Sequence, residues 1–253
     1  MLAYKNYIFD FYGTLVHIET DEESLDFWRT IAELYSSLGA TYEASELRKA
    51  YIRLVADEEA NLAQPSQLDY VEIDILQVFK RLYTECPNRD KLSWKLDLET
   101  ASRLIAAAFR IESRKELRAY DATVQLLDYL KSQGDKIFLL SNAQKAFTLQ
   151  ELKQTGLYDY FDKIYISSDY GMKKPRPQFW EMVLTENKLN LSESVMIGND
   201  FTTDIAIADS LGMDSIFINS FNYNEKELKE KNTSKVPVVE DIGGVMEVVT
   251  CMR

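Results

Sequence analysis

The sequence predicts an α/β protein in which a doubly wound parallel sheet carries an inserted, all-helical second domain. Three observations predict this class. Five short apolar runs have the length and composition of buried strands, at residues 7–11, 136–140, 163–167, 194–197 and 215–218. Helix-spaced apolar residues separate the later runs, and residues from about 21 to 117 show helical spacing with no strand pattern.

Each predicted strand is rich in β-branched or aromatic residues and is closed by polar residues or glycine, which is typical of strands buried on both faces. One intervening helix is expected to end at Gly134, another to begin at Pro177, and a third to stop at Gly212. Alternating strands and helices imply right-handed crossovers, and therefore an open, Rossmann-like sheet.

The insert shows four helical stripes, at residues 31–38, 47–55, 71–82 and 98–109. A helical insert directly after the first strand is most simply a cap domain, with hinges near residues 16–20 and 117–121. We therefore expect a catalytic core formed by residues 1–16 and 120–253, and a cap formed by residues 17–119. The tail beyond residue 219 is charge-rich and then weakly β, and it is left unassigned.

Composition restricts the partners. The chain has 253 residues and a formal net charge of −12, and this acidity argues against a nucleic-acid partner. Cys86 and Cys251 lie far apart and form no disulfide framework, which suggests a reducing compartment. No signal-peptide pattern and no run of 18 apolar residues is present, so we expect a cytoplasmic protein with no membrane contact. Nothing in the sequence indicates an oligomeric state.

His17 is the sole histidine, and this excludes several mechanisms. Zinc sites of the HExxH type and schemes with paired histidines are impossible. A GxSxG elbow, a GxxxxGK[ST] loop and a GxGxxG turn are all missing from the sequence. The chemistry must therefore depend on carboxylates, lysine, hydroxyl groups and a metal ion.

Polar groups follow four of the predicted strands. In open α/β sheets ligands bind outside the carboxyl ends of the strands, so we expect these groups to converge. They are Asp10, then Ser141 and Asn142, then Lys174 before Pro175, and finally Asp200 with Asp204.

This set suits nucleophilic displacement at an electrophile that carries negative charge. Asp10 is a candidate nucleophile, which would form a covalent intermediate. Attack of one anion on another needs a cation, and Asp10 with Asp200 would hold Mg²⁺. Lys174 adds a fixed positive charge, and Thr14 and Ser141 can donate hydrogen bonds to phosphate oxygens. A small phosphorylated molecule is the expected substrate.

The run Asp10-Phe11-Tyr12-Gly13-Thr14 and the three later stretches resemble, in order and spacing, the four motifs of the haloacid dehalogenase-like hydrolase superfamily. The resemblance implies that Asp10 is the nucleophile and that Asp10, the main-chain carbonyl of Tyr12 and Asp200 ligate Mg²⁺. It also implies that Asn142 lies at the phosphate site and that Asp204 supports the metal or orients Lys174. Lys173 is the rival for the third motif, and Lys174 is preferred because it directly precedes the proline.

Tyr12 departs from the phosphatase pattern, which has a second Asp at this position as general acid and base. A phenol with a pKa near 10 is a poor substitute, and acid–base help is worth about 10²–10⁴-fold in rate. The first motif here resembles that of the 2-haloacid dehalogenases, which need no metal. The fourth motif, with Asp200 and Asp204, resembles that of the Mg²⁺-dependent phosphatases, and the acidic pair favours a phosphatase that proceeds through an aspartyl-phosphate.

Four alternatives stay open. The protein could be a metal-independent dehalogenase, or a catalytically weak fold that binds a phosphorylated ligand. Asp200 could serve as the N-cap of the helix that follows it. Finally, His17 or a cap carboxylate, Asp69 or Glu72, could replace the missing acid.

Overall fold

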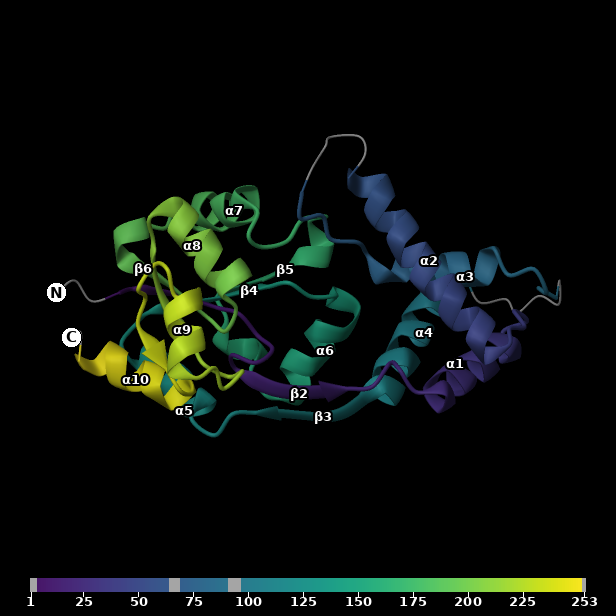
Figure 1. Ribbon diagram of the computed structural model, residues 1–253, viewed down its shortest axis with the longest axis horizontal. Helices are drawn as coiled ribbons and strands as arrows, with labels where there is room; N and C mark the ends of the chain where they lie inside the picture. The colour runs from purple at the N-terminus through teal and green to yellow at the C-terminus, as the bar shows by residue number, and fades with distance from the viewer. Residues whose placement is uncertain (1–3, 64–68, 91–96, 252–253) are drawn as a thin grey trace.

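A computed structural model describes residues 4–63, 69–90 and 97–251. The chain forms two lobes joined by a narrow pair of strands (Figure 1). One lobe contains the parallel sheet and the helices that cover it. The other contains four helices from the first half of the chain.

The larger lobe is built on a parallel sheet, for which the described residues give six strands. Its order is β5 (Lys163–Ile166), β4 (Lys136–Ser141), β1 (Asn6–Phe9), β6 (Ser194–Gly198), β7 (Asp214–Ile218) and β8 (Val238–Val239). The five predicted strands are confirmed, and β8 extends the sheet with two residues of the unassigned tail. β1 pairs with β4 on one side and with β6 on the other. The strand order therefore reverses at β1, and the carboxyl end of β1 is a topological switch point.

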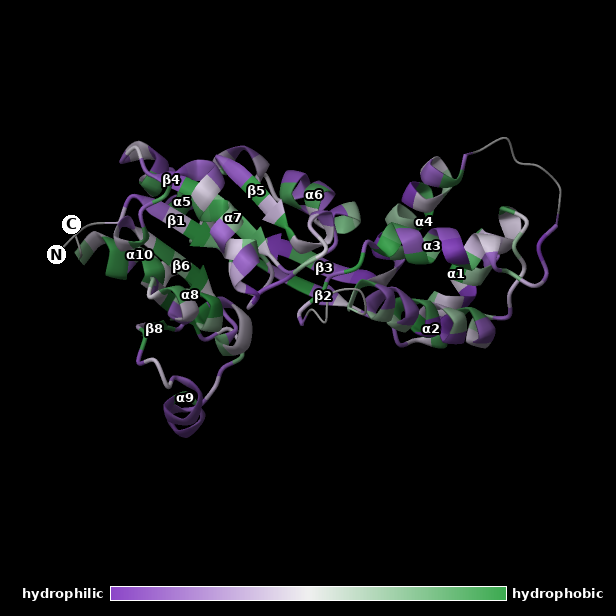
Figure 2. Cartoon of the chain, turned by 90° about the horizontal axis from the view of Figure 1, so that it is seen from above, coloured by the Kyte–Doolittle hydropathy of each residue, from purple (hydrophilic) through white to green (hydrophobic). Residues whose placement is uncertain are grey.

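Helices cover both faces of this sheet. The predicted α5 (Thr123–Ser132), α7 (Pro177–Asn187) and α8 (Ala206–Leu211) are present, and α8 continues a short π-helix at Phe201–Ile205. The structure adds α6 (Lys145–Gln154), α9 (Glu225–Lys231) and α10 (Ile242–Cys251). The strands run as a hydrophobic band between more polar helices (Figure 2).

Alternation along β1 divides the core of this lobe into two layers. Tyr7 and Phe9 belong to one hydrophobic cluster, whereas Ile8 belongs to the cluster on the opposite face. Successive side chains of a strand point to opposite faces, so a strand buried on both faces needs apolar residues at every position. Burial of each such side chain stabilises the fold by about 1.5–3 kcal/mol.

The smaller lobe contains α1 (Leu25–Ser37), α2 (Ala44–Ala63), α3 (Ile75–Thr84) and α4 (Leu98–Ser113) around its own aromatic cluster, which includes Phe27, Phe79 and Phe109. Ser24, Asp74 and Asp97 cap α1, α3 and α4 by accepting hydrogen bonds from backbone N–H groups. The third helical pattern predicted from the sequence began at residue 71. In the structure α3 begins at residue 75, directly after its N-cap Asp74.

The two lobes are joined by an antiparallel ribbon of β2 (Val16–Thr20) and β3 (Arg114–Ala119). The expectation that no strand interrupts residues 21–117 is wrong at this point. β3 reads Arg-Lys-Glu-Leu-Arg-Ala and is half-exposed or exposed along its length, so it lacks the apolar alternation that reveals a strand. Among the described residues, no helix combines the length and apolar character that a bilayer crossing requires.

Candidate active site

Asp10 follows the last residue of β1 and lies at the switch point of the sheet. Its backbone N–H donates to the carbonyl of Ile197 on β6 at 3.0 Å, which continues the ladder by one residue. Gly13 then turns the chain with φ of 75°, a conformation that glycine adopts without strain. The side chain of Asp10 is buried, with 8% of the residue exposed. The strand therefore delivers a carboxylate to the carboxyl edge of the sheet.

Lys174 lies between two carboxylates. Its Nζ donates to Asp10 Oδ1 at 2.8 Å, to Asp204 Oδ1 at 2.6 Å and to the carbonyl of Leu140 at 2.7 Å. Only 1% of Lys174 is exposed, and the three acceptors satisfy all three of its N–H donors. The structure brings together three of the polar groups that the sequence predicted at separate strand ends. Lys173, the rival, is partly exposed and lies outside this group.

Asp10, Lys174 and Asp204 form a triad in which two carboxyl groups share one ammonium group. Burial raises the pKa of the Asp204 carboxyl to about 7, although the neighbouring Lys174 ammonium opposes the rise. Burial acts to lower the pKa of Lys174, but the net direction is upward because Asp10 and Asp204 favour its charged form. Lys174 therefore stays cationic at neutral pH and holds Asp10 in place.

The second motif is tied to the third. Asn142 Nδ2 donates to the carbonyl of Lys174 at 3.0 Å, and the N–H of Lys174 donates to Asn142 Oδ1 at 2.8 Å. This pair fixes the backbone that carries the lysine. Ser141 at the end of β4 is 1% exposed, and its Oγ has no hydrogen-bond partner among the described residues. Such a buried hydroxyl is costly unless a ligand completes it.

The fourth motif packs against Asp204. Oδ2 of Asp204 accepts from the N–H groups of Asn199 at 3.1 Å and Asp200 at 3.2 Å. Gly198 is required here because a Cβ would lie 2.2 Å from that oxygen. Asp200 Oδ1 accepts from the backbone N–H and the hydroxyl of Thr202, both at 2.7 Å, so Asp200 caps the π-helix. The described residues form no hydrogen bond to Asp200 Oδ2 or to Asp10 Oδ2.

Thr14 is fully buried, and its Oγ1 donates to Asn199 Oδ1 at 3.5 Å. The first and fourth motifs are thus connected through Asn199, which was not among the predicted site residues. Asn199 Nδ2 in turn donates to Ser220 Oγ at 2.9 Å.

Tyr12 is turned toward α6 and α4. Its hydroxyl donates to Glu151 and lies 2.9 Å from Thr148 Oγ1. Arg110 on α4 donates from Nε to Glu151 Oε1 at 2.7 Å and from Nη2 to Glu151 Oε2 at 3.1 Å. Arg114 adds a fourth hydrogen bond to Glu151, from Nη1 to Oε1 at 3.0 Å. This Tyr12–Glu151 cluster links the first motif to both lobes.

Glu151 is the buried member of the Tyr12–Glu151 cluster, with 1% of the residue exposed. Burial first, and the charge of Glu151 second, raise the pKa of Tyr12 well above its usual value. Neither Glu151 nor Arg110 was predicted from the sequence. No sequence signal marks them, because α6 itself was not predicted and a lone glutamate in a polar helix is usually exposed.

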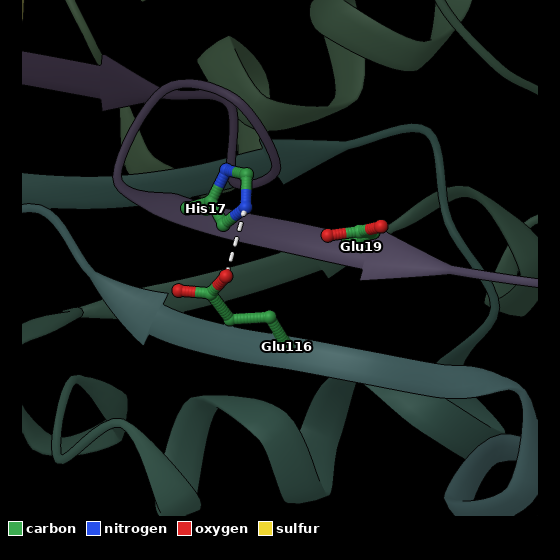
Figure 3. Close-up of side chains that lie close together, drawn as sticks. All are labelled: His17, Glu19 and Glu116. Carbon is green, nitrogen blue, oxygen red and sulfur yellow. Dashed lines mark ion pairs between the residues drawn. The ribbon is translucent and has the colours of Figure 1, made fainter.

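The candidate replacement acids lie in different places. His17 is on β2, and its Nε2 lies 3.6 Å from Glu116 on β3, with Glu19 nearby (Figure 3). This group lies on the exposed ribbon, and none of its contacts reaches Asp10. Asp69 is exposed.

Glu72 is placed differently from the other two candidates. It accepts from Gln144 Nε2 at 3.0 Å and from Ser167 Oγ at 2.9 Å. It therefore contacts the loop that follows the second motif.

Glu72 and Tyr12 line the same cavity, of about 320 Å³, between the helical lobe and α6. A larger cavity of about 750 Å³ lies near α3, α4 and α6, and none of the predicted site residues lines it. The smaller cavity is therefore the one associated with the first motif.

The carboxyl edge of the sheet thus carries a buried carboxylate at its switch point, held by a lysine from a later motif. The family model for haloacid dehalogenase-like hydrolases matches residues 7–218. The chain belongs to this family of enzymes.

Two relatives are phosphatases by name. The glyceraldehyde 3-phosphate phosphatase of Methanothermobacter thermautotrophicus is 32% identical over 134 residues, which cover 53% of this chain and 59% of that protein. The enzyme of the same name from Pyrococcus furiosus is 23% identical, with 84% of this chain and 90% of that protein covered. The alignment with the first relative thus spans less than two thirds of its length.

Solved structures show the same fold. A 2-haloacid dehalogenase from Pseudomonas syringae has a TM-score of 0.65 at 18% identity, with 99% of this chain and 100% of that chain covered. A HAD phosphatase from Thermococcus onnurineus has a TM-score of 0.59 at 18% identity, with 97% of each chain covered. At this level of identity, the two solved structures support an assignment of the fold alone and not of an activity.

Proposed function

We propose that this protein is a Mg²⁺-dependent phosphatase that acts on a small phosphorylated metabolite through an aspartyl-phosphate on Asp10. The observation that carries this proposal is the buried Asp10–Lys174–Asp204 triad at the switch point of the sheet. The names of the relatives favour a phosphatase over a dehalogenase. We propose further that residues 17–119 act as a cap over a core of residues 1–16 and 120–253.

Asp10 is the proposed nucleophile. One of its oxygens forms a bond to phosphorus while the bond from phosphorus to the leaving oxygen breaks, and water later hydrolyses the resulting acyl-phosphate. Lys174 holds Oδ1 of Asp10 by a charge-assisted hydrogen bond at 2.8 Å, which leaves Oδ2 free to attack. Ser141 Oγ, buried and without a partner among the described residues, is the proposed donor to a phosphate oxygen.

The residues fit a divalent cation. Asp10, Asp200 and Asp204 supply three carboxylates against the single ammonium of Lys174, and Asp200 has one oxygen that is not engaged by a described residue. Hard oxygen donors with excess negative charge suit Mg²⁺. Asp10, Asp200 and the carbonyl of Tyr12 would hold the ion, which when bound offsets the charge of the phosphate. Asp204 supports this arrangement by orienting Lys174 and the backbone of the fourth motif.

Tyr12 does not fit the role of general base. Its pKa is raised by burial, so the phenol stays protonated, and its hydrogen bond is already given to Glu151. The leaving group must therefore depart with little help, or take a proton from Glu72 or water. Acyl and aryl phosphates, whose leaving groups are stable as anions, should be the fastest substrates.

The test is phosphate release from p-nitrophenyl phosphate, acetyl phosphate and a set of sugar phosphates, with Mg²⁺ or with EDTA. We expect release that requires Mg²⁺ and that falls on the order of 10⁴-fold in Asp10→Asn, which keeps the shape of the side chain but removes the nucleophile.

A parallel assay measures halide release from 2-chloropropionate. Halide release that persists in EDTA, with no phosphate release from any ester, would establish a dehalogenase instead. The Tyr12 motif is the observation that keeps this second function in the test.

A further inference from the structure

The cavity beside Tyr12 carries a pronounced charge imbalance. Three carboxylate side chains line it, all from the helical lobe and its approaches: Glu22, Glu59 and Glu72. Arg110 is the one cation among its described lining residues. The cavity is therefore acidic at the place where it meets the first motif.

Arg110 offsets these carboxylates only in part: its charge acts to lower the pKa of Glu22, but its hydrogen bonds go to another acid. Two of its N–H groups bind Glu151, which is buried and belongs to the Tyr12–Glu151 cluster. The guanidinium also lies over the ring of Phe147 at 5.1 Å, so its flat face is covered on one side. A bidentate, partly desolvated arginine has little capacity left for a second anion. Lys173 acts on Glu72 electrostatically but does not line the cavity.

Two of the carboxylates are partly buried, and burial raises the pKa of both Glu22 and Glu72. Glu59 on α2 is exposed at the rim and adds to the rise at Glu72. A group that enters this cavity meets carboxyl oxygens that accept hydrogen bonds. It also meets the apolar walls of Val55, Ile73 and Phe147.

The size of the cavity limits the occupant. A volume of about 320 Å³ equals roughly ten water molecules, at about 30 Å³ each, and lies at the small end of ligand pockets. Tyr12, two residues after Asp10, and Ala143, two residues after Ser141, both line this cavity, so it borders the loops that carry the proposed nucleophile and the proposed phosphate donor.

Resting on the proposed phosphatase function, we infer that this cavity binds the leaving group and selects a small, uncharged polyol or amino alcohol over a leaving group that carries a second anion. Hydroxyl and ammonium groups donate to the three glutamates. A carboxylate or second phosphate faces like charge in a partly desolvated site, where repulsion is stronger than in water.

The experiment compares three substrates of similar size: glycerol 3-phosphate, phosphoethanolamine and 3-phosphoglycerate, with p-nitrophenyl phosphate as the reference for chemistry. We expect kcat/KM for 3-phosphoglycerate to be at least about tenfold below that for glycerol 3-phosphate. In Glu22→Gln, Glu59→Gln and Glu72→Gln, the ratio of the two should shift toward 3-phosphoglycerate by about threefold to tenfold. Activity on phosphoethanolamine should fall in the same variants.

Glu33→Gln is the matched control. It makes the same change of charge on an exposed position of α1, outside the cavity, and should leave the ratio unchanged. Equal use of 3-phosphoglycerate and glycerol 3-phosphate by the wild type, or an unchanged ratio in all three variants, would overturn the inference. If p-nitrophenyl phosphate is still hydrolysed with dependence on Asp10 and Mg²⁺, only the inference fails. If no phosphate ester is hydrolysed, the proposed function fails and the inference with it.

Discussion

Two buried carboxylates, Asp204 and Glu151, lie in regions with opposite charge balance. Asp204 and Asp10 share the single ammonium of Lys174, so that region has one negative charge in excess when both acids are ionised. Glu151 forms ion pairs with the guanidinium groups of both Arg110 and Arg114, so that region has one positive charge in excess.

The difference shows which region is complete. Glu151 receives hydrogen bonds from two arginines and from Tyr12, and the excess positive charge there lies on guanidinium groups that are partly exposed to water. The triad of Asp10 instead leaves a carboxylate oxygen without a partner among the described residues and lies near the orphan hydroxyl of Ser141 at the same sheet edge. Buried charge without compensation is expensive, so such an imbalance persists where a ligand compensates it.

Removal of the cation from the triad should have the largest effect. In Lys174→Met, Asp10 and Asp204 face each other with no positive charge between them, and Asp10 loses the contact that orients it. We expect kcat to fall at least about 10³-fold, and the free energy of unfolding to fall by about 3–5 kcal/mol. Lys173→Met, a change at the adjacent lysine outside the triad, is the control. Equal losses in the two variants would refute the role of Lys174.

Removal of the carboxylate from the other region should affect stability more than chemistry. Glu151→Gln leaves the partly buried Arg110 and Arg114 without an anion, which should lower the free energy of unfolding by about 3 kcal/mol, as measured by urea denaturation. Glu99→Gln is the comparison, because Glu99 also pairs with two cations, Lys80 and Arg103, but is exposed. The midpoint of unfolding should hardly move in that variant. A Glu151→Gln protein as stable as Glu99→Gln would contradict this account.

The smallest effect is expected from Tyr12→Phe, which deletes one hydroxyl from the Tyr12–Glu151 cluster. The lost hydrogen bond should lower the free energy of unfolding by about 1 kcal/mol. The dependence of kcat/KM on pH should keep its shape between about pH 5 and 9, because a phenol whose pKa is raised stays protonated throughout that range. A lost or displaced limb of the pH profile in this variant would show that Tyr12 takes part in proton transfer.

The same contrast separates what the sequence could predict from what it could not. β1 and β6 are continuous apolar runs, and the parallel sheet followed from them. The order of strand ends and polar residues predicted that Asp10 and Lys174 would converge, and the family resemblance implied that Asp204 supports the metal or orients Lys174; the structure brings the three together.

Glu151 and Arg110 form their contacts only after α4 and α6 have packed, and nothing local in the chain marks them. The strand β3 was not predicted from the sequence for a related reason. Its residues are mostly charged, and it is a strand because β2 lies beside it.

The ribbon of β2 and β3 has a consequence for the evolution of the family's chemistry. The chain leaves the sheet lobe on one strand and returns on its hydrogen-bonded neighbour, so the entry and exit of the helical segment are adjacent in space. A helical segment whose two ends are adjacent in this way can be replaced by another segment without a change in the order of the sheet strands. A chimaera that keeps residues 1–20 and 114–253 and receives a foreign helical segment should preserve Asp10 and its lysine while it changes what is admitted to them.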